Sequence, residues 1–358
     1  MFNLIEHVWL NFLNMCDNMF NMDAKEYIYE ILKNSTVPLS AVEIAKRKNT
    51  PSRTYTAHLL SELVTERKVK KIREGKRIFY SAIGTILDRT FRIKNLHEDE
   101  IWEIIRRTPG FIESLSDQAE TALQFAFTEM LNNAIDHSKS GVAHVLMGVS
   151  GDSVFFTIRD YGIGAFNSLM AKKAYPDTLS TIQELVKGKN TSDPIHHSGE
   201  GIFWTSKIAD YFELRSFDYS LVVDNTIQDY TIRKIEERLV GTEVYFRIEK
   251  ESKKSIRELF HSYSLDPKKL TLDTTTIPIK LYDLGEVWIS RSQAKKVLMN
   301  LEKYKKVIFD FGGLDLIGQG FADEIFRVYQ NEHPDMILEP INMNETIAIL
   351  VNDAREKV

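Results

Sequence analysis

The apolar positions near the amino-terminal end of the chain follow the spacing of three short helices. A first helix is predicted over residues 24–33. Ser40 and Glu43 then form a capping-box pair, in which each side chain bonds a backbone amide at the start of a second helix. A third helix is predicted to begin near Pro51, with an inward apolar stripe formed by Leu59, Leu60, Leu63 and Val64.

Two short segments with strand character follow the third helix. KVKKI and RIFYSA flank Glu74 and Gly75, which predicts a β-hairpin. Three helices followed by a hairpin resemble a winged helix-turn-helix domain, here over residues 22–85. Residues 1–21 are predicted to be an extension rather than a targeting signal, because polar residues break their apolar run and they lack a positive start.

The predicted hairpin region is basic, although the formal net charge of the whole chain is −5. Seven basic residues stand in the eleven positions 67–77. Because lysine and arginine contacts to phosphate supply much of nucleic-acid affinity, the winged helix is predicted to bind duplex DNA, with the amino end of its third helix facing base edges. A role as a protein-docking or structural module stays open. The residues predicted to contact DNA are Arg53, Tyr55, Thr56, Lys70, Lys71, Arg73, Lys76 and Arg77.

Helices and strands alternate over residues 111–250, after a charged helical connector predicted over residues 86–110. The pattern indicates a helix through Glu129, two strands, a long irregular insert over residues 165–198, a further helix and closing strands. This order is typical of a mixed α/β sandwich.

The last third begins a new β-α-β-α-β series near Leu270. Its stretch KVIFDFGGLDLIGQGFADEIFRVY resembles the STAS-like fold of anti-sigma-factor antagonists, in which a serine or threonine before a helix accepts phosphate from a kinase. The matching loop here, residues 316–320, has no hydroxyl, so phosphorylation at that point is excluded. Gln319 is left either to bond a partner backbone or to cap the loop. With a STAS-like domain over residues 270–358, the predicted fold class is α+β with several domains.

Four short motifs stand in order in the middle third. Glu129 and Asn133 are four residues apart on a predicted helix, so their side chains share one face. The other three motifs are Asp160-x-Gly162-x-Gly164, Gly199-Glu200-Gly201 and Gly241-Thr242. In this order they resemble the ATP-binding fold shared by gyrase, heat-shock chaperones, histidine kinases and the mismatch-repair protein MutL. Residues 111–250 are therefore predicted to be a histidine-kinase-like ATP-binding domain.

The residue types in these motifs suit Mg²⁺ and ATP. Mg²⁺ prefers oxygen ligands and keeps several waters, so Asn133 together with phosphate oxygens is predicted to hold it. Glu129 is a candidate to orient or deprotonate a water, and the glycine turn of the third motif offers backbone amides to phosphate. The resemblance implies that Asp160 accepts a hydrogen bond from the adenine amino group and that Thr242 completes that pocket. The predicted nucleotide-binding residues are Asn133, Asp136, Asp160, Gly162, Gly164, Gly199, Glu200, Gly201 and Thr242.

The irregular insert is long enough to act as a lid. Four of its lysines are candidates to reach the γ-phosphate, with solvated charges on a loop as the plainer interpretation: Lys172, Lys173, Lys187 and Lys189. His97 and Glu98 begin the phosphoacceptor pattern of a histidine kinase, but the residues after them do not continue it. Autophosphorylation on histidine is therefore not expected.

Cysteine content and hydropathy limit the compartments in which the protein is expected to act. Cys16 is the only cysteine, which excludes a disulfide framework and a thiolate zinc site and favours the reducing cytoplasm. No run of 18 or more apolar residues is present, so a membrane span is not expected.

These expectations combine into a cytoplasmic regulator whose winged helix binds DNA and whose central domain responds to Mg-ATP, with hydrolysis left open. The alternative is a serine/threonine protein kinase or an anti-sigma-type partner-switching protein that acts on another polypeptide. A structural ATPase that forms a homodimer through nucleotide-dependent lid contacts is a third hypothesis.

Overall fold

The computed structural model describes residues 23–33, 35, 38–47, 50–66, 68–74, 77–173, 175–188, 200–266, 268, 271–282 and 289–357. The chain divides into two compact units. One comprises Met1–Asp88 and Met147–Phe155, and the other comprises Arg89–Leu146 and Phe156–Val358. Among the described residues, no helix combines the length and apolar character that a bilayer crossing requires.

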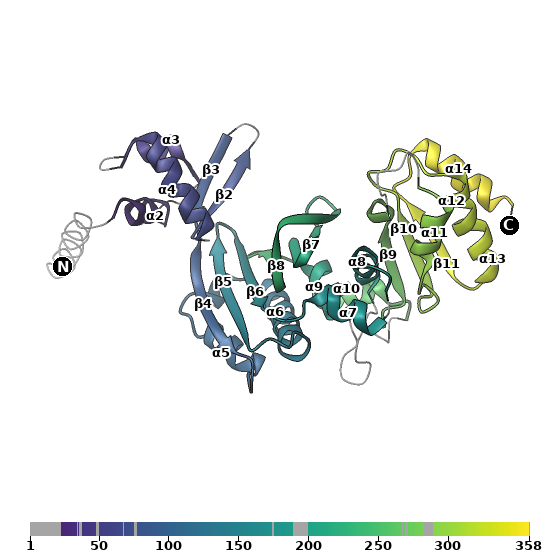
Figure 1. The fold of residues 1–358 in the computed structure, drawn as a ribbon, viewed down its shortest axis with the longest axis horizontal. Coiled ribbons are helices and arrows are strands. Elements are labelled where there is room, and N and C mark those ends of the chain that lie inside the picture. Colours follow the sequence, from purple (N-terminus) through teal and green to yellow (C-terminus); the bar gives the residue numbers. More distant parts are fainter. Residues whose placement is uncertain are drawn as a thin grey trace. The chain divides into compact units, whose positions relative to one another are not determined.

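The amino-terminal region of the first unit packs helices on a small sheet (Figure 1). The predicted first helix and the capping box of Ser40 and Glu43 are confirmed, because their signals are local. The predicted hairpin is confirmed, and a two-residue strand that was not predicted completes a sheet of order β1-β3-β2. The elements are α2 (Ala24–Lys33), β1 (Leu39–Ser40), α3 (Ala41–Ala45), α4 (Arg53–Thr65), β2 (Val69–Glu74) and β3 (Arg77–Ala82).

A five-stranded sheet of order β4-β5-β6-β8-β7 forms the framework of the middle third. The prediction of a helical connector is wrong over residues 86–92, where β4 forms an edge strand. The charged residues of this segment suggested a connector. In the structure, Asp88, Arg89 and Arg92 are exposed, as charged residues on edge strands commonly are. The strands are β4 (Gly84–Arg92), β5 (Val142–Ser150), β6 (Ser153–Asp160), β7 (Tyr211–Asp224) and β8 (Asp229–Glu249).

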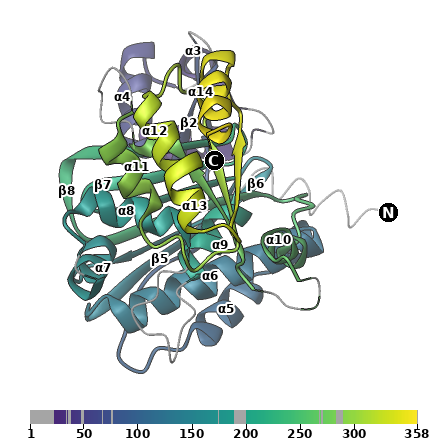
Figure 2. The same cartoon turned by 90° about the vertical axis from the view of Figure 1, so that its right-hand side faces the viewer.

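Helices α6 and α9 lie in contact beside this sheet (Figure 2). The predicted irregular insert instead contains two helices, α7 (Ala165–Lys173) and α8 (Thr178–Lys187). Asp177 caps α8 by accepting a hydrogen bond from the Ser180 amide at 2.7 Å. The other helices of this region are α5 (Glu98–Arg106), the short 3-10 helix η1 (Ile112–Ser114), α6 (Asp117–His137), α9 (Gly201–Ile208) and α10 (Ile256–Tyr263).

The predicted β-α-β-α-β order of the last third is confirmed as a parallel sheet of order β11-β10-β9 with helices around it (Figure 1). The predicted second helix contains a central π-helical stretch, and a carboxyl-terminal helix, α14, was not predicted. The elements are β9 (Thr274–Pro278), η2 (Ile279–Tyr282), α11 (Arg291–Leu298), β10 (Lys306–Asp310), α12 (Gln319–Asp323), η3 (Glu324–Tyr329), α13 (Gln330–Glu332), β11 (Ile337–Ile341) and α14 (Glu345–Arg355).

Candidate functional site

The first motif lies on α6, which aromatic packing holds against the sheet. Phe127 of α6 meets Phe156 of β6 edge to face, with 5.6 Å between ring centroids, and Phe156 stacks on Phe246 of β8 at 5.0 Å. Glu129 and Asn133 are both half-buried on this helix. Because they are four residues apart, both side chains project from the same side of α6.

The third motif meets the first at the start of α9. Gly201 is the first residue of α9, and a Cβ there would lie 2.1 Å from Oε2 of Glu129. A larger residue therefore does not fit beside this carboxylate unless the carboxylate moves. The amino-terminal end of a helix attracts anions, and the Glu129 carboxylate lies against the first residue of α9.

The second and fourth motifs meet at Asp160, the last residue of β6. Its side chain is 4% exposed and accepts hydrogen bonds from the Gly162 amide, at 2.9 Å, and from the side chain and backbone of Thr242. Burial raises the pKa of the Asp160 carboxyl above its ordinary value, and these hydrogen bonds act in the opposite direction. The hydroxyl of Thr242 also accepts from the Ala165 amide at 2.9 Å, which ties this group to the start of α7.

Close backbone contacts connect these motifs. A Cβ on Gly162 would lie 1.8 Å from the carbonyl oxygen of Ser138, at the end of α6. Gly241 has φ +85°, and a Cβ on it would lie 2.2 Å from the carbonyl oxygen of Asp160. Gly164 is buried directly before α7. Helix α6 thus touches the second motif through Ser138 and the third through Glu129, and Ser138 is a contact that the sequence did not indicate.

The remaining predicted nucleotide residues are less central. Asp136 is exposed on α6. The Glu200 carboxylate accepts a hydrogen bond from the indole of Trp204 at 3.0 Å, so it bonds within α9. Gly199 lies outside the described residues.

The candidate lysines of the insert take different positions. Lys172 is exposed near the end of α7, whereas Lys187 is fully buried at the end of α8. Its ammonium donates to the carbonyl of Met299, at 2.8 Å, and pairs with Glu184, so Lys187 is not available to a phosphate. The side chain of Lys173 and the whole of Lys189 lie outside the described residues.

The chemistry of the donors fits a magnesium ion held with a nucleotide rather than by the protein alone. Among the described residues, no group of three or more His, Cys, Asp or Glu side chains is placed to hold a metal ion. An amide oxygen such as that of Asn133, with phosphate oxygens and waters, is the ligand set that Mg²⁺ accepts.

The predicted DNA-contacting residues divide by exposure. Arg53, Tyr55, Lys71, Arg73 and Arg77 are exposed, and Lys70 is half-buried. The prediction for Thr56 is wrong, because its side chain is fully buried and its hydroxyl donates to the carbonyl of Pro51 at 3.1 Å. This threonine stabilises the start of α4 and does not face outward. Lys76 lies outside the described residues.

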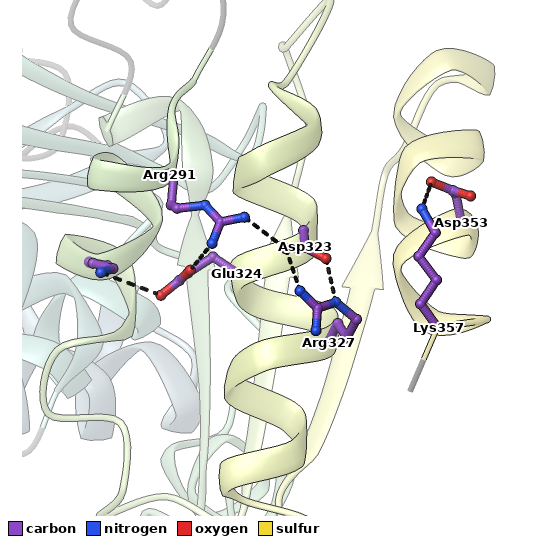
Figure 3. Close-up of polar contacts among 7 residues, drawn as sticks. Arg291, Asp323, Glu324, Arg327, Asp353 and Lys357 are labelled. Carbon is purple, nitrogen blue, oxygen red and sulfur yellow. Dashed lines mark hydrogen bonds and ion pairs between the residues drawn. The ribbon is translucent and has the colours of Figure 1, made fainter.

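Gln319 lines a pocket of about 270 Å³ in the carboxyl-terminal region. Arg291 bridges Asp323 and Glu324 at 2.8 and 3.1 Å, and Arg327 also binds Asp323 (Figure 3). Cationic and anionic side chains therefore alternate near the pocket. This favours a polar ligand over an apolar one. The other lining residues include Gly320, Leu350, Asp353, Ala354 and Lys357.

Comparison with known families supports the interpretation of this last region. A family model described as a STAS-like domain of unknown function (DUF4325) matches residues 293–348. No curated protein matches the chain. The STAS-like character predicted for the carboxyl-terminal region is therefore confirmed over the matched residues.

Proposed function

We propose that this protein is an ATP-binding regulator, in which residues 111–250 form a histidine-kinase-like ATP-binding domain of the gyrase and MutL type. The proposal rests above all on the meeting of four motifs that are far apart in the sequence. Thr242 bonds Asp160, Gly162 abuts the end of α6, and Gly201 abuts Glu129. A turn or polar network that arose by chance would not bring all four motifs to one helix and one strand end.

The roles of the residues follow from their positions. Asp160, as a buried carboxylate at a strand end, accepts a hydrogen bond from the adenine amino group. Asn133, together with phosphate oxygens, would hold Mg²⁺, and the ion would neutralise negative charge on the nucleotide. Glu129, beside the first turn of α9, orients or deprotonates a water near the γ-phosphate.

Residues 22–85 are proposed to be a winged helix that binds duplex DNA. The exposed cations on β2 and β3 (Lys71, Arg73 and Arg77) support this function, as does the order of the helices and the β1-β3-β2 sheet. The three-domain division of the chain, with a STAS-like domain over residues 270–358, is part of the same proposal. ATP regulates DNA binding only if the affinity for ATP differs between two conformations of the protein.

One experiment tests this function as a whole. The full chain is mixed with a fluorescent duplex, and anisotropy is followed with and without Mg-ATP while phosphate release is measured in parallel. We expect salt-sensitive DNA binding that Mg-ATP changes, and Glu129→Ala is expected to retain nucleotide binding but lose phosphate release. DNA affinity that is identical with and without a bound nucleotide would reject the switch.

A second candidate function is a protein kinase or partner-switching protein of the anti-sigma type. The STAS-like match and the polar pocket beside Gln319 favour it. Transfer of radiolabel from ATP to a partner polypeptide, without any effect of DNA, would select this function over the first.

A further inference from the structure

Most of helix α8 is buried, and several of its side chains bond the carboxyl-terminal region. Every residue from Ser180 to Lys187 is buried, including polar ones. Gln183 donates to the carbonyl of Leu281 at 2.8 Å. Asn300 donates to the carboxylate of Glu184, also at 2.8 Å. A helix of the proposed nucleotide domain is thus held by side-chain hydrogen bonds to residues outside that domain.

The last residue of α8 receives the densest set of these contacts. The Lys187 ammonium bonds the carbonyl of Met299, and the Lys187 carbonyl accepts from Thr275, at 2.8 Å, and from Tyr304, at 2.5 Å. Both its charged end and its backbone are therefore fixed by β9 and by the segment after α11. Buried polar groups with this many partners behave as a rigid unit.

The next residue connects this unit to α9. Gly188 has φ +82°, and a Cβ on it would lie 2.8 Å from Leu272 and 3.2 Å from the ring of Phe203. Phe203 belongs to the first turn of α9, whose first residue, Gly201, abuts the Glu129 carboxylate. Glycines with no room for a side chain thus stand between the carboxyl-terminal region and α9, and between α9 and the proposed catalytic residue.

We propose that the α8 end, defined as Lys187 and Gly188, couples the STAS-like domain to the proposed nucleotide site by fixing the position of α9 against Glu129. The proposal rests on the proposed ATP-binding function. A nucleotide that moves α9 must displace Phe203 against Gly188 and thereby disturb the hydrogen bonds of Lys187. By reciprocity, a partner that shifts the STAS-like domain changes the affinity for ATP by the same factor.

Hydrogen–deuterium exchange on the full-length wild-type protein tests this coupling without any substitution. Saturating Mg-ATP is expected to change amide exchange both in residues 201–208 and in residues 296–304. A change confined to residues 117–208 overturns the coupling but leaves ATP binding intact. An absence of ATP binding, measured on the same sample, overturns the proposed function itself.

A matched pair of glycine variants provides the second test. Gly188→Ala inserts a methyl between Phe203 and Leu272, whereas Gly110→Ala has a similar φ, +74°, with nothing within 4 Å. We expect Gly188→Ala to change the Kd for Mg-ATP by about fivefold or more and Gly110→Ala to leave it within about twofold. Equal effects of the two variants would overturn the proposal, and the exchange experiment decides it if Gly188→Ala does not fold.

Discussion

At the residue scale, Asp160 and Lys187 are both ionisable and both buried. The Asp160 carboxyl accepts hydrogen bonds from its neighbours, as a group that recognises a ligand requires. Lys187 pairs with Glu184, and both of these side chains are at most 3% exposed. The first is proposed to bind a ligand, and the second holds two parts of the chain together. Their burial is similar, and only their partners distinguish the two roles.

Removing one member of the buried pair is expected to be costly. Lys187→Met leaves the Glu184 carboxylate and the Met299 carbonyl buried without their shared donor, and we expect it to lower the free energy of unfolding by about 3–5 kcal/mol in urea titrations. The double variant Glu184→Gln/Lys187→Met is expected to recover most of this loss. Lys172→Met, at an exposed lysine of α7, should stay within about 0.5 kcal/mol of the wild type. A single variant as stable as this control would contradict the pairing.

The pH dependence of stability reports on the same residue. Burial lowers the pKa of Lys187 from its usual 10.5 to about 8, against the opposing charge of Glu184. Between these two values the unfolded chain binds more protons than the folded protein, so stability rises with pH. Relative to Lys187→Met, the wild type is expected to gain at most about 3 kcal/mol from pH 8 to 10.5. A difference between the two proteins that falls over this range would refute the lowered pKa.

At the scale of single elements, the sequence predicted what local signals determine. The α2 helix, the capping box of α3 and the β2–β3 hairpin each carry their signal within a few residues. The two-residue strand β1 depends on pairing with β3, about forty positions away, and was missed. The sequence predicts a loop in place of α8, because the partners of its charged residues lie far along the chain. Lys187 donates to the Met299 carbonyl, and Glu184 accepts from the Asn300 amide.

In the candidate site too, the sequence indicates local features but not long-range contacts. The motif residues can be recognised in the sequence, because one helix and tight turns fix their spacing. The close approach of Ser138 to Gly162 and of Gly201 to Glu129 comes from the packing of α6, β6 and α9, which no local pattern specifies. The wrong assignment of Thr56 has the same origin, because burial at the start of α4 depends on the core around it.

The proposed wing gives a prediction at the element scale. Lys71 and Arg73 are exposed two residues apart on β2, so their side chains share one face. We expect Lys71→Glu/Arg73→Glu to weaken duplex binding for all sequences and to reduce the salt slope by about two. Fluorescence anisotropy at several salt concentrations measures both quantities.

A matched variant controls for net charge in that experiment. Lys94→Glu/Lys172→Glu makes the same change of charge at exposed lysines outside the proposed winged helix and should leave binding close to wild type. If both double variants weaken DNA binding equally, the effect belongs to overall charge and the wing has no specific role.

At the scale of the whole molecule, one chain combines a proposed winged helix, a proposed ATP site and a region matched by a STAS-like family model. The proposed ATP site and the STAS-like region are connected through the α8 end, so a signal at either one can reach the other. This arrangement favours a regulator over a simple ATPase. A simple ATPase would not need the helices beside its catalytic residue to contact a second domain.

Calorimetric titration of Mg-ATP into the full-length protein tests the central claim most directly. The wild type is expected to bind with a Kd between micromolar and millimolar. Asp160→Asn, which replaces the buried carboxylate by an amide of similar shape, is expected to abolish binding, whereas Asp152→Asn in the exposed β5–β6 turn should not change it. A wild-type protein that binds no Mg-ATP, or an Asp160→Asn variant that binds it equally well, would contradict the proposed site.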